Sequence, residues 1–346
     1  MPAGTTKVRD GKYWRMSGGR GSCGIVALTA ELWYSHFAIM RAAAILGMGC
    51  SARDLKPFQR DTAVEWRMGM PVFSDQVDVI LLFGGDGTIH RHLGQLVRMG
   101  LPVLVVPAGS GNDFARALGL RRVRDSLAVW QKFCAGAGNL RVIDLGVISA
   151  AGDAGGAPSV IAQGSSVPQE RGRYFCCVAG VGLDGEVSRR ANQLPRWLRG
   201  HGGYVLSLVP TIFSFAPLLI KILAPAASSG ETASWTALSD QPTILAAFAN
   251  TPVYGGGMKI APQAKMDDGM LDICVVGGIA PFKLFTLFHT VYRGLHLDIR
   301  EVGYFHAARV RVETEHPLDV YADGEYVCRT PVEVAIQPAA LQVVTP

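Results

Sequence analysis

Two short apolar runs, each followed at once by a glycine-rich turn, constrain the fold of this chain more than any other feature. Val77–Phe83 has the composition of a strand buried on both faces, and Gly84–Thr88 (G-G-D-G-T) follows it. Leu101–Val106 is a second such run, and Pro107–Asp113 is a second glycine-rich turn. Apolar residues recur at helical spacing after the first turn and begin another helix after the second. This alternation of strand, turn and helix predicts an α/β layer on a parallel sheet.

The two turns form a candidate phosphate site. Glycines let backbone N–H groups approach phosphate oxygens, and a following helix offers its positive end. A carboxylate in the turn, here Asp86, can hold Mg²⁺ against the phosphates. The alternatives are a D-G hairpin for the first turn and a simple helix start, capped by Ser110, Asn112 or Asp113, for the second. Because two such turns on neighbouring strands would open on one edge of the sheet, the pair favours a nucleotide site.

The pattern changes beyond Asp144. Ser149–Gly172 and Ala226–Gln241 are rich in small residues and read as loops. Several short apolar runs with turn signals predict a β-sandwich-like second domain: Tyr174–Val178, Ile244–Phe248, Leu271–Val276, Ala308–Glu313 and Leu318–Tyr321. We expect an N-terminal extension over residues 1–39, which is a candidate flexible segment. The α/β domain would then span 40–146, with the chain returning at about 322–346, and the β-rich domain would span 147–321.

Composition excludes several classes of protein. The formal charge of +5 suits an anionic partner such as ATP or a lipid surface, but is too weak to indicate nucleic acid. The chain has seven cysteines, an odd number, and no C-x-x-C pair. This argues against a disulfide scaffold or a structural zinc site and favours a reducing cytoplasm as the location. We find no signal peptide. The apolar stretch Tyr204–Ala227 contains three prolines and Lys221, so we expect core elements or surface contact rather than a membrane span.

The two turns, G-G-D-G-T and P-A-G-S-G-N-D-F-A-R, strongly resemble the diacylglycerol kinase catalytic domain family, which includes bacterial diacylglycerol kinases and sphingosine kinases. Further segments match that family in the same order: Gly180–Asp184, Asn250–Met258 with Pro262–Ala264, Asp268–Asp272 and Asp323–Glu325. The resemblance implies an NAD-kinase-like α/β nucleotide-binding domain plus a β-sandwich-like second domain that supplies much of the lipid site. It also implies an ATP-dependent lipid kinase whose acceptor is a hydroxyl of a diacylglycerol-like or sphingoid lipid.

The family's functional residues carry over to matching positions. Asp86 would serve the catalytic Mg²⁺–ATP, and Glu325 would be the general base for the lipid hydroxyl, although a solvated glutamate at a turn is the alternative. A structural Mg²⁺ would bind the Asp268 carboxylate and the main-chain carbonyls of Lys265 and Met270, with a tight metal-free D-G turn as the alternative. The ATP-binding residues would be Gly84, Gly85, Asp86, Gly87, Thr88, Ile89, His90, Ser110, Gly111, Asn112 and Asp113.

Two departures from the family concern the nucleotide site. The usual N-P-x-S-G-type phosphate loop is absent, and Gly47–Cys50 stands nearest to it. His90-Arg91-His92 follows the first turn where the family often has Asn-Glu. These two histidines are not expected to bind one metal ion together, because His90 and His92 would point about 200° apart on a helix.

The sequence leaves other functions and partners open. An NAD kinase-like enzyme shares the first turn, and a catalytically weak lipid- or nucleotide-binding regulatory protein would explain the missing loop. We expect a lipid substrate at the membrane surface, no nucleic acid, and a cytoplasmic protein with possible peripheral contact at the inner face of the membrane; a homodimer is a possible assembly. One cluster could dock on anionic lipid or simply form a solvated helix: Arg189, Arg190, Arg196, Trp197, Leu198 and Arg199.

Overall fold

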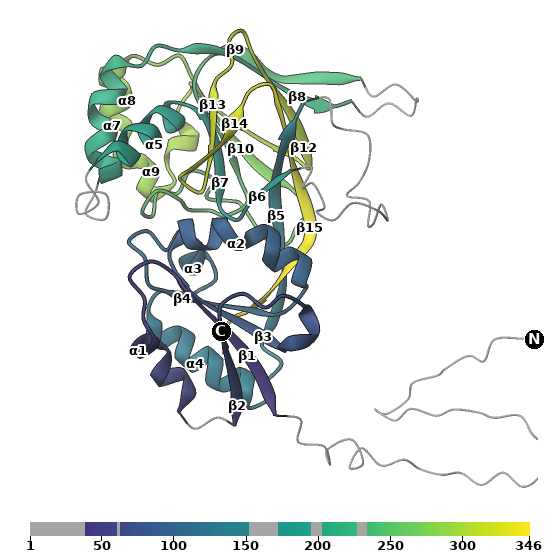
Figure 1. Ribbon diagram of the computed structural model, residues 1–346. Coiled ribbons are helices and arrows are strands. Elements are labelled where there is room, and N and C mark those ends of the chain that lie inside the picture. Colours follow the sequence, from purple (N-terminus) through teal and green to yellow (C-terminus); the bar gives the residue numbers. More distant parts are fainter. Residues whose placement is uncertain (1–38, 61–62, 152–171, 195–202, 227–233) are drawn as a thin grey trace, which may run out of the picture. The chain divides into compact units, whose positions relative to one another are not determined.

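The computed structural model describes residues 39–60, 63–151, 172–194, 203–226 and 234–346 (Figure 1). The predicted N-terminal extension, apart from Ile39, lies outside the described residues. The part of the basic cluster from Arg196 to Arg199 also lies outside them.

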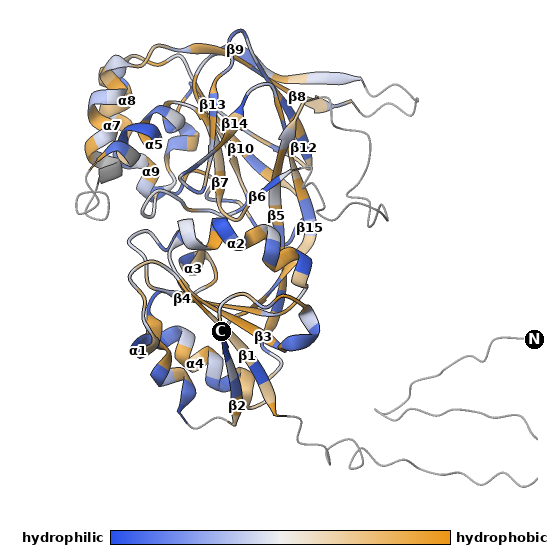
Figure 2. Cartoon of the chain, viewed as in Figure 1, coloured by the Kyte–Doolittle hydropathy of each residue, from blue (hydrophilic) through white to orange (hydrophobic). Residues whose placement is uncertain are grey.

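The parallel region begins with β1 (Met40–Leu46), β3 (Val79–Gly84) and β4 (Val103–Pro107), which run parallel side by side. β2 (Val64–Met68) pairs with the outer edge of β1. Every residue of β3 and β4 is buried, and Figure 2 shows both strands in orange. This is the two-sided burial that their apolar sequences predict.

Short helices connect these strands. Helix α2 (Asp86–Met99) buries Ile89, Leu93 and Leu96, the residues at helical spacing, and ends at Gly100 in the left-handed conformation. The other helices of this region are α1 (Ala52–Leu55), α3 (Asp113–Ala117) and α4 (Val123–Cys134), with single 3₁₀ turns at Lys56–Gln59 and Ser74–Gln76. The predicted strand–turn–helix alternation is therefore confirmed.

The antiparallel region is built mainly of strands. Neighbours follow the order β14-β13-β7-β9-β8-β12, and β10 pairs with β9 and β11. These strands are β6 (Arg173–Phe175), β7 (Val178–Gly182), β8 (Leu218–Pro225), β9 (Trp235–Ala249), β10 (Leu271–Gly277), β11 (Val302–Ala307), β12 (Arg309–Thr314), β13 (Asp319–Ala322) and β14 (Glu325–Arg329). The prediction of a loop up to Gln241 was wrong in part, because Trp235 already begins β9 and pairs with Pro225 of β8.

Two long strands join the regions. β5 (Leu140–Ala150) and β15 (Val332–Val344) pair antiparallel along most of their length, with an irregularity between Gln337 and Leu341. Near its start β15 pairs with β12, and at Val343 it pairs with β4. The chain therefore re-enters the parallel sheet through β15, whereas β14, within the return expected from about 322, belongs to the antiparallel region.

Among the described residues, four helices flank the antiparallel strands. They are α5 (Leu183–Gln193), α7 (Gly203–Ser214), α8 (Pro281–Leu287) and α9 (His289–Arg293), followed by a 3₁₀ turn at His296–Asp298. In the part of the chain that the structure describes, no helix combines the length and apolar character needed to cross a bilayer.

Candidate active site

The two glycine-rich turns lie against each other at one edge of the parallel sheet. Gly84 and Pro107 are in register at the ends of β3 and β4, and the Ala108 N–H donates to the Gly84 carbonyl over 3.1 Å. A Cβ atom added at Gly109 would lie only 2.4 Å from the Gly85 Cα atom. Glycine is therefore required at Gly109, because the two main chains touch there.

Asp86 links the two turns through hydrogen bonds. It is the first residue of α2, yet its carboxylate accepts the backbone N–H of Asp113 at 3.0 Å and of Phe114 at 3.1 Å. A Cβ atom at Gly111 would lie 2.8 Å from Asp86 Oδ2. Burial raises the pKa of Asp86 to about 6; the Asp113 N–H opposes this shift, while the negative charge of Asp113 adds to it.

A magnesium ion suits this carboxylate. Asp113 and Asp323 both raise the pKa of Asp86 through their charge. Among the described side chains, none forms an ion pair with Asp86. A buried carboxylate without an ion-pair partner is stabilised by a hard cation with oxygen ligands, and Asp86 is the residue that could hold one.

Asp113 joins the second turn to the antiparallel region. One oxygen of its buried carboxylate accepts the Gly256 N–H at 2.8 Å, and the other accepts from Arg116 at 2.6 Å. Asn112 has a positive φ of 56°, and its amide bonds both the N–H and the carbonyl of Gly109. These predicted ATP-binding side chains thus shape the turn, whereas Ser110 is exposed at its tip.

Residues of the first turn divide between surface and interior. The Thr88 side chain packs against Gly84 and Gly47, where an added Cβ would lie 2.7 Å from it in each case. Ile89 is buried in the core. The Gly47 N–H donates to the Phe83 carbonyl at 2.7 Å, so the turn after β1, the nearest equivalent of the absent phosphate loop, shares the same edge.

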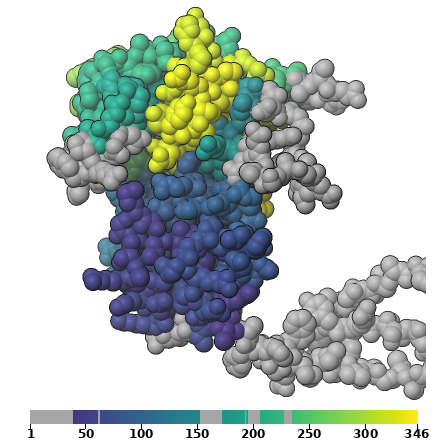
Figure 3. Space-filling view, in the orientation of Figure 1, coloured from purple at the N-terminus to yellow at the C-terminus, as the bar shows by residue number. Residues whose placement is uncertain are grey.

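Glu325 lies on the first turn although 238 residues separate it from Gly87 in the sequence. A Cβ atom at Gly87 would lie 2.9 Å from Glu325 Oε1. Glu325 is exposed and begins β14. Figure 3 shows the yellow C-terminal part of the chain meeting the blue part that contains this turn. An exposed carboxylate is thus placed beside the paired turns.

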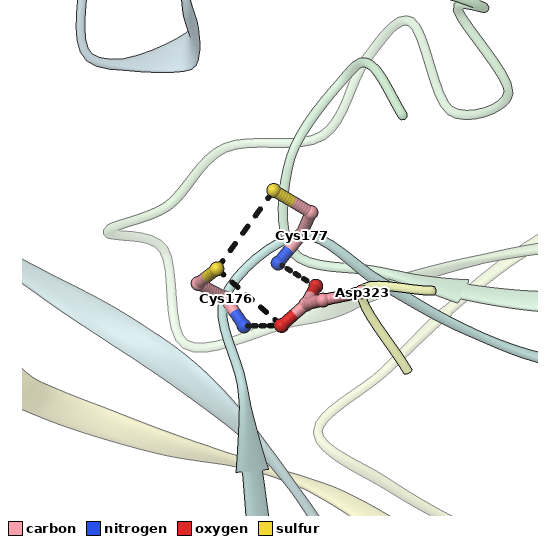
Figure 4. A group of neighbouring side chains, drawn as sticks. All are labelled: Cys176, Cys177 and Asp323. Atoms are coloured by element: carbon pink, nitrogen blue, oxygen red, sulfur yellow. Dashed lines mark hydrogen bonds between the residues drawn. The ribbon is translucent and has the colours of Figure 1, made fainter. Parts of the chain in front are cut away.

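Asp323 holds the segment that carries Glu325. Its fully buried carboxylate accepts the N–H groups of Cys176 at 2.9 Å and Cys177 at 2.8 Å (Figure 4). It also contacts His90 Nδ1 at 3.2 Å. Burial raises the pKa of the Cys176 thiol well above its usual value, so the thiol is neutral here. This cluster is an anchor between α2 and the antiparallel strands. The sequence matches did not reveal that role for Asp323, nor that His90 is its partner.

The segment predicted to bind a structural magnesium ion forms a tight turn. Asp268 Oδ1 accepts the Met270 N–H at 3.1 Å, and Gly269 has a φ of +72°. The Gly269 N–H donates to buried Asp144, whose other oxygen accepts the Ala339 N–H. Lys265 and Asp268 are exposed. Oxygen ligands are the type that a hard cation prefers, and Asp144, which sequence reasoning missed, anchors the turn.

An apolar cavity of about 70 Å³ lies among the helices of the antiparallel region. Its few polar neighbours are Asp184, whose Oδ1 accepts from the Tyr254 hydroxyl at 3.1 Å, and His296, whose Nε2 contacts the Ile260 carbonyl at 3.0 Å. Tyr254 belongs to the same turn as Gly256, which binds Asp113. The cavity is lined mainly by Leu183, Val187, Leu208, Ile212, Leu284, Leu287, Phe288 and Val291.

Comparisons with known proteins agree with this geometry. The family model described as the diacylglycerol kinase catalytic domain matches residues 64–148, and the one described as the YegS C-terminal NAD kinase beta sandwich-like domain matches residues 177–345. These matches confirm the predicted resemblance and the NAD-kinase-like fold class with its β-sandwich-like second domain.

Several named proteins are similar over most of the chain. A diacylglycerol kinase of Mycobacterium tuberculosis (strain ATCC 25618 / H37Rv) is 33% identical over 275 residues, covering 78% of this chain and 77% of that protein. A diacylglycerol kinase of Bacillus subtilis (strain 168) is 27% identical over 273 residues, covering 78% of each. A solved diacylglycerol kinase structure from Bacillus anthracis str. Sterne has a TM-score of 0.57 at 16% identity, covering 89% of this chain and 97% of that chain, and supports the fold.

Proposed function

Because this chain belongs to the diacylglycerol kinase family, which is a family of lipid kinases, we propose that it transfers the γ-phosphoryl group of ATP to a lipid hydroxyl. The acceptor is a diacylglycerol-like or sphingoid lipid. The observation that carries this proposal is the position of Glu325 Oε1 against Gly87, directly beside Asp86 and the two paired turns.

The paired turns suit a triphosphate. Gly85, Gly87 and Gly109 place no side chain over the paired turns, and α2 directs the positive end of a 14-residue helix toward the first turn. Asp86 would hold the Mg²⁺ that accompanies ATP. When bound, this ion neutralises charge on the phosphates and so favours their transfer.

Glu325 suits the role of general base. It is exposed, so a lipid hydroxyl can reach it, and Asp323 holds the main chain just before it. The hydroxyl proton passes to Glu325 while the hydroxyl oxygen forms a bond to the γ-phosphorus. The bond between that phosphorus and the bridging oxygen breaks, and ADP leaves.

The apolar cavity suits the hydrocarbon part of the acceptor. It is small in the free protein, so an alkyl chain must widen it by moving side chains of α7 and α8. The turn containing Tyr254 contributes to the cavity, and its Gly256 N–H binds Asp113 of the nucleotide turns. One loop thus links the proposed lipid and nucleotide sites.

Incubation with labelled ATP, Mg²⁺ and a total lipid extract tests the proposal, with each labelled product identified by mass. We expect a phosphorylated lipid, lost when the divalent cation is chelated. A parallel reaction offers NAD as acceptor. Label on NAD alone would establish the NAD kinase-like alternative, and binding of ATP without transfer to any acceptor would establish the regulatory alternative.

A further inference from the structure

Helix α7 carries large apolar side chains on its outer face as well as on its buried face. Leu206, Val209 and Phe213 are 56%, 40% and 53% exposed and share one face at helical spacing. On the opposite face Ser207 and Thr211 are buried, and the Thr211 hydroxyl donates to the Ser207 carbonyl at 2.6 Å. A surface helix normally presents polar residues to water, so the apolar outer face of α7 indicates an interaction surface.

Helix α8 continues this apolar surface. Phe282 is 72% exposed and Phe285 is 44% exposed, and the ring of Phe285 lies 5.8 Å from that of Phe213 on α7. Figure 2 shows the apolar colouring of these neighbouring helices. We call the continuous surface the α7–α8 patch and define it by Leu206, Val209, Phe213, Phe282 and Phe285.

The charges around the α7–α8 patch favour an anionic partner. Helices α7, α8 and α9 contain Lys283 and Arg293 and no Asp or Glu, and Lys283 pairs with Glu301 at 2.6 Å. Arg190 of α5 reaches Ser214 at the end of α7, with 3.3 Å between Nη2 and Oγ. Arg190 also pairs with Glu186 at 2.7 Å, so basic attraction is modest and the apolar side chains contribute most of the binding.

The α7–α8 patch and the apolar cavity share the same two helices. The same two helices turn Leu208, Ile212, Leu284 and Leu287 toward the cavity and the patch residues away from it. The cavity proposed for the hydrocarbon chain of the acceptor therefore lies directly behind the patch. This arrangement favours a bilayer, the source of such a lipid, over a second copy of the chain as the occupant.

We propose that the α7–α8 patch inserts its apolar side chains into the surface of a bilayer that contains anionic lipids. In this position the helices lie in the interface, where Phe and Leu side chains with flanking cations are stabilised, and lead the acceptor lipid to the cavity. The delivery step rests on the proposed lipid kinase function, whereas attachment to the bilayer does not.

Vesicle binding by matched variants tests this proposal. L206Q/F213Q/F282Q removes apolar groups only from exposed positions of the patch, and M68Q/V72Q/F73Q makes the same number of changes at exposed apolar residues of the parallel region. Co-sedimentation uses vesicles of equal parts phosphatidylcholine and phosphatidylglycerol. Because three large apolar side chains would no longer be buried in the bilayer, we expect the patch variant to bind at least roughly tenfold more weakly. The parallel-region variant should bind like the unaltered protein.

Phosphate transfer to a short-chain, water-soluble diacylglycerol separates this proposal from the proposed function. If the patch variant phosphorylates the soluble acceptor normally but fails on vesicles, both ideas are supported. If the unaltered chain binds vesicles through the patch and phosphorylates no lipid, only the proposed function is overturned. Equal vesicle binding by both variants overturns the docking proposal, as does a patch variant that changes only from dimer to monomer in size-exclusion chromatography.

Discussion

The parallel and antiparallel regions form their proposed binding surfaces from different parts of the residue, main chain in one and side chain in the other. In the parallel region the surface of the glycine-rich turns is formed by main-chain atoms, because Gly85 and Gly109 touch and leave no room for side chains. In the antiparallel region the surface is side chain, with an apolar cavity whose walls come from four separate helices and several strands. Main-chain surfaces of this kind suit the invariant shape of a phosphate, whereas a wall of flexible side chains can adapt to hydrocarbon chains of different length.

This difference implies that substitutions in the two regions have separate consequences. Changes at the glycine turns should alter the use of ATP, and changes at the cavity should alter the use of the acceptor. Glu325 is the exception, because it begins a strand of the antiparallel region and lies on a turn of the parallel region.

The largest effect is expected for Glu325→Gln. The amide keeps the size of the side chain but cannot accept the hydroxyl proton, so we expect kcat to fall by roughly 10²–10⁴-fold with little change in the KM for ATP. Steady-state kinetics with labelled ATP measures both quantities. Glu315→Gln, at an exposed glutamate of the antiparallel region, is the control and should retain activity. A rate for Glu325→Gln equal to that of the control would rule out Glu325 as the base.

Gly109→Ala should separate the two turns. Its Cβ atom would overlap the Gly85 Cα atom at 2.4 Å, and forcing the main chains apart should lower the free energy of unfolding by about 1–3 kcal/mol. Since the turns would no longer be paired, the KM for ATP should rise while the preference among acceptor lipids stays the same. Urea denaturation and kinetics with varied ATP test the two effects.

Gly278→Ala is the matched control for this substitution. An added Cβ there meets Pro217 at 3.7 Å, which is ordinary van der Waals contact. We expect it to leave stability and the KM for ATP nearly unchanged. If both alanine variants behaved alike, close contact between the turns would not matter for ATP.

Asp323→Asn should weaken the link between the regions. The new amide group places a donor where the carboxylate accepts the N–H of Cys176 or Cys177, and each hydrogen bond lost lowers the free energy of unfolding by about 1 kcal/mol. Because Glu325 lies two residues away, kcat should also fall, with the KM for ATP less affected. Asp319→Asn, which removes only an exposed pair with Arg329, is the control and should keep kcat. An unchanged kcat in Asp323→Asn would show that Glu325 needs no such support.

The parts of the site that were predictable are those encoded by neighbouring residues. The strand before Gly84, the turn itself and the helix after it follow from one continuous segment, so the sequence predicts them together. The role of Asp323 is different, because its partners Cys176 and Cys177 lie 147 and 146 residues away and contribute backbone N–H groups, which leave no trace in composition. Glu325 was found only through the family resemblance for the same reason.

The fold shows the same division. Val79–Gly84 is buried on both faces and is recognisable as a strand, whereas Trp235–Gln241 contains exposed polar residues and resembles a loop. That segment is a strand because it pairs with β8, a contact that depends on tertiary structure. The cavity was not predicted either, since its lining residues come from segments between Leu183 and Val302 that meet only in the folded chain.

The smallest effect concerns His296 in the wall of the cavity. Burial lowers the pKa of His296, while its contact with the Ile260 carbonyl raises it. The unfolded chain therefore binds a proton more readily than the folded chain, and the free energy of unfolding should rise with pH until it levels off above about 6.5. His296→Gln should flatten this part of the pH profile, whereas His289→Gln, at an exposed histidine, should retain it. A profile of His296→Gln that matched the unaltered chain between pH 5 and pH 7 (roughly the histidine range) would contradict this prediction. His296 would then be in contact with water, and the cavity would be no less hydrated than the exposed turns.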